Sequence, residues 1–72
     1  MEQKTIGKFI SALRKAEGMT QKDLAEKLHY GYTAIANYES GRNEPSIDVL
    51  IKLANALDVT VDELVGAEKK EI

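Results

Sequence analysis

The chain has 72 residues, one histidine and no cysteine. A chain of this length forms one domain that buries about 60% of its unfolded surface, and without cysteine it has neither a disulfide nor a thiolate metal site. The lone His29 cannot form a metal site by itself. No apolar run is long enough for a signal peptide or a membrane span, so we expect a cytoplasmic protein with no cofactor and no membrane contact.

Charge is divided unevenly along the chain. Residues 1–43 hold seven Lys/Arg against five Asp/Glu, a net +2, whereas residues 44–72 hold three against seven, a net −4. The first part is therefore suited to approach a polyanion while the second part stays away from it. The same pattern is equally typical of solvated faces with no charged partner, and the net charge of −2 argues weakly against nucleic acid.

Two helices are predicted in the first half of the chain. Aliphatic residues recur at helical spacing between positions 6 and 13, and Gly18 is placed to end the segment, so we expect a helix over about residues 5–17. Thr20 and Asp23 have the spacing of a variant capping box. The second helix therefore begins at residue 21 and runs for two turns before the sequence HYG breaks it.

A third and a fourth helix follow. Ile35 and Tyr38 face inward in a helix over about residues 32–40, and Gly41 stands where left-handed backbone ends a helix. Ser46 then caps a helix whose core face is made by leucines and an alanine at helical spacing.

The last helix opens with a full capping box, Thr60 to Glu63, and contains Leu64. No segment alternates apolar and polar residues with the period of a strand, so the predicted fold class is all-α. Five short helices joined by short turns must pack at steep angles, because they are too short for a parallel bundle.

The second helix, the tight turn and the third helix have the pattern of a helix-turn-helix. The stretches "LRKAEGMTQKDLAEKL", "IANYESGRNEPS" and "VLIKLANALDVTVDEL" also occur in the order and spacing of the phage-repressor and Cro-type helix-turn-helix family, which the chain resembles from Ile6 to Leu64. The resemblance implies a compact, five-helix, lambda-repressor-like domain over residues 1–66. Residues 67–72 are mostly charged, and we expect them to form a tail that frays. The resemblance also implies a small transcriptional regulator, a repressor, that binds specific sequences of double-stranded DNA through the major groove.

By this resemblance, the third helix meets base edges with residues that point away from Ile35. An asparagine pairs with adenine N6 and N7, and threonine and alanine contact the thymine methyl group, so readout leans toward A·T pairs. The implied base contacts are Tyr32, Thr33, Ala36 and Asn37. Tyr32 either contacts a base or phosphate or packs on the second helix, whereas the other two tyrosines, Tyr30 and Tyr38, are expected to pack in the core.

The resemblance further implies phosphate contacts on both sides of that helix. Gln21 stands where the family clamps a phosphate beside the free amides of a helix end, and Arg42 stands where the family places a basic residue. The full expected set is Thr20, Gln21, Lys22, Ser40, Arg42 and Asn43. Lys22 is equally compatible with a merely solvated lysine, and solvation is the expectation for Lys27.

The family often pairs an arginine of the first helix with a glutamate of the third, and Arg14 and Glu39 occupy these positions. We therefore expect a structural ion pair. Two residues depart from the family pattern: His29 replaces a turn glycine and Gly31 replaces a Ser/Thr cap. Histidine tolerates positive φ and glycine is an acceptable cap, but Gly31 lacks a hydroxyl group for a phosphate.

Assembly is also implied by the resemblance, as a homodimer on an inverted repeat. Its surface comes from the last helix and the loop before it. The three valines of this region suit either the homodimer or a protein partner: Val59, Val61 and Val65. The alternative is a protein-interaction module on the same fold, such as an antitoxin whose main partner is a protein. An enzyme is not expected, because the chain has no nucleophile-elbow or phosphate-loop motif and little room for a preorganised pocket.

Overall fold

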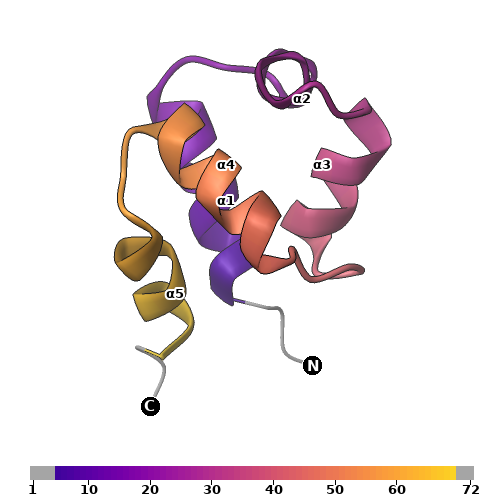
Figure 1. Cartoon of the computed structure of the whole chain (residues 1–72). Coiled ribbons are helices and arrows are strands. Elements are labelled where there is room, and N and C mark those ends of the chain that lie inside the picture. The colour runs from indigo at the N-terminus through magenta and orange to yellow at the C-terminus, as the bar shows by residue number, and fades with distance from the viewer. Residues whose placement is uncertain (1–4, 70–72) are drawn as a thin grey trace.

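The computed structural model describes residues 5–69, in which five helices follow one another without a strand (Figure 1). The all-α fold class is confirmed, and α2 and α3 begin where the sequence predicted. Within these residues no helix is long and apolar enough to cross a membrane. The elements are α1 (Thr5–Ala16), α2 (Gln21–Leu28), α3 (Tyr32–Ser40), α4 (Ile47–Leu57) and α5 (Val61–Lys69).

Side-chain caps start three of these helices. The Thr20 hydroxyl accepts from the Asp23 N–H at 3.0 Å, and the Asp23 carboxylate accepts from the Thr20 N–H at 2.9 Å, which completes the predicted capping box. Thr60 and Glu63 form the same reciprocal pair before α5, at 3.0 and 2.8 Å. The Ser46 hydroxyl accepts from the amide of the third residue of α4. These bonds satisfy amides that a helix start leaves without a partner.

Four helices end in the same way, with one residue in the left-handed region. The N–H of the next residue then donates to the carbonyl five positions back, which is the Schellman arrangement. The left-handed residues are Gly18, His29, Gly41 and Asp58, with φ of 73°, 61°, 86° and 59°. Gly18, His29 and Gly41 stand at helix ends or turns that the sequence predicted. Asp58 carried no such signal, although aspartate visits this region more readily than most residues.

The helices surround one hydrophobic core. Figure 1 shows α5 on one side of α1 and α4, α3 on the other side, and α2 across the top. The largest fully buried side chains come from all five helices: Ile10, Leu24, Ile35, Leu53, Leu57 and Leu64. At Gly7, α1 approaches α3 so closely that a Cβ atom would lie 2.6 Å from one α3 carbonyl oxygen and 2.8 Å from the next. The backbone of α3 is therefore seated directly on α1.

The last helix is longer than the sequence pattern predicted. The tail was expected to begin at residue 67, but α5 continues to Lys69. Alanine, glutamate and lysine at positions 67–69 all favour helix, so a helix that starts from a capping box continues through them. The rest of the predicted tail, residues 70–72, lies outside the described residues.

Candidate nucleic-acid interface

A buried ion pair joins α1 to α3, as predicted. The Arg14 Nε donates to Glu39 Oε2 at 2.6 Å and Nη2 donates to Oε1 at 3.0 Å, and the two side chains are only 9% and 8% exposed. A third donor, Nη1, reaches the Met19 carbonyl at 2.8 Å. The hydrogen bond with Glu39 raises the pKa of Arg14 above its ordinary value, against the opposing effect of burial. The planar guanidinium group therefore fixes the last turn of α3 relative to α1 and to the loop that follows α1.

Glu39 also accepts a hydrogen bond from Gln21, the residue predicted to contact a phosphate. The Gln21 Nε2 donates to Glu39 Oε1 at 3.0 Å, a contact that the sequence did not predict. The amide group carries two N–H donors, so this bond uses one of them and leaves the second without a partner among the described residues. Because Gln21 is the first residue of α2, this bond brings the start of α2 beside the end of α3, where Ser40 and Arg42 follow Glu39.

The start of α2 offers backbone donors as well. Its capping box uses the N–H groups of Thr20 and Asp23, which leaves the N–H groups of Gln21 and Lys22 unpaired among the interactions of the described residues. The backbone N–H of Thr20 lowers the pKa of Asp23, with a smaller contribution from the Thr20 hydroxyl. Lys22 is exposed. This end of the helix therefore combines a positive dipole end with an exposed cation.

The loop after α3 is held by the helix that precedes it. The Asn37 carbonyl accepts from the Arg42 and Asn43 N–H groups at 3.0 and 3.2 Å, and from the Ser40 hydroxyl at 3.2 Å. The Ser40 oxygen in turn accepts from the Arg42 N–H at 3.4 Å. The Arg42 and Asn43 side chains are exposed beyond this backbone frame. Ser40 thus shapes the loop, and the two residues after Gly41 project from it.

The outer face of α3 is uncharged. Tyr32 is 56% exposed, Thr33 is exposed, and Ala36 and Asn37 are half-buried. The charged residue of this helix, Glu39, is neutralised by Arg14. Tyr30 and Tyr38 pack against the core, as expected. An approaching polyanion therefore meets polar and apolar side chains on α3 and cationic or N–H donor groups on either side.

The three valines expected at a dimer surface are half-buried and pack against the core. The sequence interpretation missed two more exposed aliphatic side chains on α4, Ile47 at 67% and Ile51 at 45% exposed. Their spacing of four residues could have predicted this surface, because it places both side chains on one side of the helix, in a second apolar stripe displaced from the core face.

Comparison with known proteins gives the family. The helix-turn-helix family profile matches residues 10–64. The HTH-type transcriptional regulator ImmR of Bacillus subtilis is 38% identical over 65 residues, which is 90% of this chain and 51% of that protein. The chain spans about half or less of the curated relatives it matches.

Solved structures agree with this match. The biofilm master regulator SinR, in complex with DNA, matches with a TM-score of 0.78 and 34% identity over 83% of this chain and 97% of that chain. The P22 c2 repressor, in complex with a synthetic operator, gives a TM-score of 0.78 and 30% identity over 82% of this chain and 89% of that chain. The sequence and the fold of the present chain both show that it belongs to the helix-turn-helix family, as the resemblance to phage-repressor and Cro-type domains predicted.

Proposed function

We propose that the chain is a small transcriptional regulator, a repressor, that binds double-stranded DNA with α3 in the major groove. The observation that carries this proposal is the match, at 34% identity over 83% of the chain, to SinR solved in complex with DNA. The uncharged outer face of α3, flanked by N–H donors and cations, supports it. Such a surface lets backbone phosphates position the protein while base edges provide specificity.

On this proposal, the reading face of α3 consists of Tyr32, Thr33, Ala36 and Asn37. Asn37 forms two hydrogen bonds with an adenine, and Thr33 and Ala36 contact thymine methyl groups. None of these side chains carries the forked cation that recognises guanine, so the preferred half-site is rich in A·T pairs. One bidentate pair contributes about 1–3 kcal/mol of discrimination.

Phosphate contacts would come from two segments that the Gln21–Glu39 hydrogen bond brings together. The first is the start of α2, with Thr20, Gln21 and Lys22, and the second is the end of α3 with its loop. Because the Arg14 guanidinium group neutralises Glu39, that carboxylate does not repel the phosphates on either side. Residues expected to contact phosphates from the second segment are Ser40, Arg42 and Asn43.

A single domain of this size buries too little surface for tight binding to an operator. We therefore propose a homodimer that places one α3 in each of two successive major grooves, about 34–36 Å apart along an inverted repeat. The interface would consist of Val59, Val61 and Val65, at α5 and the loop before it, whose outer parts remain accessible.

Selection from a random duplex library tests the proposal. We expect an inverted repeat rich in A·T pairs to be enriched. Asn37→Ala should relax selection at one position of each half-site, whereas Asn55→Ala, an asparagine on α4, should leave the selected sequence unchanged. If no sequence is enriched, or if Asn37→Ala selects the same sequence with the same stringency, the proposed reading face is wrong.

Assembly requires a separate measurement. Light scattering coupled to size exclusion should detect a dimer, and Val61→Glu should shift it toward monomer. Ile51→Glu is the matched comparison on α4. If Ile51→Glu dissociates the dimer and Val61→Glu does not, the interface lies on α4 and the valine assignment is wrong.

The alternative function, a module whose main partner is a protein, gains support from the two exposed isoleucines Ile47 and Ile51. Exposed aliphatic pairs of this kind suit a protein contact more than a phosphate backbone. Affinity capture with a tagged chain tests this alternative. If the chain captures a stoichiometric protein partner through these two residues and enriches no DNA sequence, the protein-interaction function replaces the regulator proposal.

A further inference from the structure

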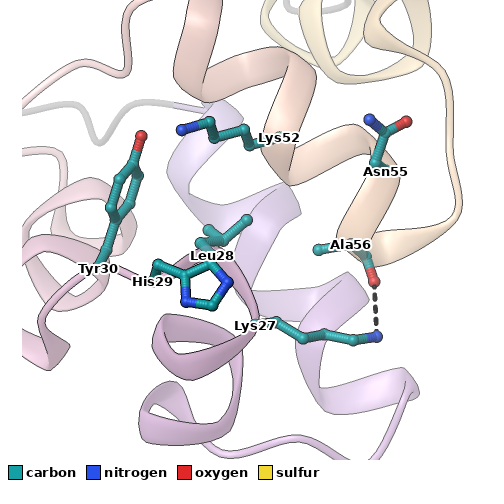
Figure 2. A pocket seen from close by; sticks show the side chains of 7 residues that line it. All are labelled: Lys27, Leu28, His29, Tyr30, Lys52, Asn55 and Ala56. Atoms are coloured by element: carbon teal, nitrogen blue, oxygen red, sulfur yellow. Dashed lines mark hydrogen bonds between the residues drawn. The ribbon is translucent and has the colours of Figure 1, made fainter.

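A cavity of about 430 Å³ opens between the end of α2, the turn that follows it, and the last turns of α4. Figure 2 shows Tyr30 on one side of it, Asn55 and Ala56 on the other, and Leu28 between them. Its volume lies in the range of pockets that bind small molecules, about 300–1,000 Å³. No lining residue belongs to α3 or to the expected phosphate contacts, so the proposed function does not account for the cavity.

The wall of the cavity is fixed by the fold. Leu28 is buried in the core, and the Tyr30 N–H donates to the Ala25 carbonyl at 2.9 Å, which pins the turn after α2. Ala56 is half-buried on the last turn of α4, which packs against α2. Leucine, the tyrosine ring and the alanine methyl group thus form a preformed apolar floor that needs little rearrangement to accept a ligand.

Cationic groups stand around this floor, and no acidic residue lines it. Lys52 of α4 places its ammonium group 5.2 Å from the centre of the Tyr30 ring. Lys27 of α2 was expected to be merely solvated, but its Nζ lies 3.5 Å from the Ala56 carbonyl, at the limit of a hydrogen bond. Neither lysine pairs with a carboxylate in the part of the chain that the structure describes. Two ammonium groups from different helices therefore border one cavity, and no carboxylate lines that cavity.

We propose that this cavity binds a small organic anion whose apolar body packs on Leu28, Tyr30 and Ala56 and whose charged group pairs with Lys27 or Lys52. The Asn55 amide can donate to or accept from a polar group of the same ligand. The anionic group is a carboxylate or a phosphate monoester, since both accept hydrogen bonds from lysine. An aromatic or branched body suits the floor better than a sugar, because three of the lining side chains present carbon atoms.

Titration of the isotope-labelled chain without DNA tests this inference independently of the proposed function. The probes are 2-naphthoate, 2-naphthyl phosphate, the neutral 2-naphthylmethanol and inorganic phosphate. We expect a saturable shift of the backbone amide signals of Leu28, His29, Tyr30, Asn55 and Ala56 with one or both naphthyl anions. The expected Kd is on the order of 1 mM, as is usual for fragment-sized ligands.

Charge variants locate the site. Substitution of the lysine that pairs with the anion, by Lys27→Gln or Lys52→Gln, should weaken binding of the bound naphthyl anion about two- to fivefold, and the double variant should weaken it at least as much. Lys15→Gln, an exposed lysine on α1, is the matched control and should have no effect. Tighter binding of 2-naphthoate assigns a carboxylate ligand, and tighter binding of 2-naphthyl phosphate assigns a phosphate monoester.

Three results would overturn the inference. The first is the absence of saturable shifts at the cavity amides with either naphthyl anion. The second is equal binding of 2-naphthylmethanol together with unchanged binding by the lysine variants, which would remove the role of charge. The third is equal affinity for inorganic phosphate, which would remove the role of the apolar floor.

Discussion

Removal of Glu39 tests the buried network on which the geometry of the interface depends. Glu39→Leu deletes the acceptor of two Arg14 hydrogen bonds and of the Gln21 amide, and leaves the guanidinium group buried with only the Met19 carbonyl. Removing one partner of a buried pair costs about 3–5 kcal/mol. A chain of 72 residues has a total stability of about 4–11 kcal/mol, so this variant should lose a large part of it.

Urea unfolding followed by circular dichroism measures the loss. With a slope of about 1 kcal/mol per molar urea, the midpoint should fall by roughly 3 M or more. Arg14→Met combined with Glu39→Leu should recover most of the loss, because no unpaired charge remains in the core. Glu26→Leu, at an exposed glutamate of α2, should stay within about 0.5 kcal/mol of the parent. A loss below about 1 kcal/mol for Glu39→Leu, the range of exposed pairs, would refute the reasoning, as would a double variant no more stable than the single one.

Three further predictions concern the backbone and the caps. Gly7→Ala should cost about 1–3 kcal/mol because its Cβ meets two α3 carbonyl oxygens, whereas Gly66→Ala, which meets nothing within 4 Å, should gain up to about 1 kcal/mol in the same urea assay; equal effects would contradict the close approach. His29→Gly should raise stability by about 0.5–1 kcal/mol, because glycine adopts a φ of 61° without strain, and a loss would show that the imidazole makes a contact that outweighs it. The pKa of Asp23 is lowered by the N–H at the helix cap, so its contribution is complete above its ordinary pKa of about 3.9 and is lost as the pH falls through the lower folded value. The urea midpoints of the parent and Asp23→Asn should therefore differ at neutral pH and converge in acid, and a difference independent of pH would contradict this.

Features of the fold that depend on local chemistry were predictable from the sequence. Thr20, Ser46 and Thr60 marked three helix starts, because a hydroxyl that accepts from an amide two or three residues later acts within a few positions of the chain. Gly41 marked the end of α3 for an equally local reason. The length of α5 was missed because helix propensity adds up gradually and gives no sharp end signal.

Contacts between distant segments were predictable only in part. The Arg14–Glu39 pair was expected from the family resemblance, yet the third member of the network, Gln21, was not. Its amide meets Glu39 only because α2 and α3 cross at one particular angle, which no local pattern encodes. The same holds for the cavity, whose two lysines, Lys27 and Lys52, lie far apart in the sequence and come together through the packing of α2 on α4.

The salt dependence of DNA binding tests the central claim most directly. For the duplex enriched in the selection, the logarithm of the binding constant should fall linearly with the logarithm of salt concentration, with a slope of about −0.9 for each phosphate that the protein neutralises. Arg42→Ala should make the slope shallower by about 0.9, because the variant neutralises one phosphate fewer, whereas Asn37→Ala should weaken binding to this duplex at an unchanged slope. A slope near zero for the parent chain, or the same change of slope for both variants, would contradict the assignment of α3 to the bases and of its flanks to the phosphates.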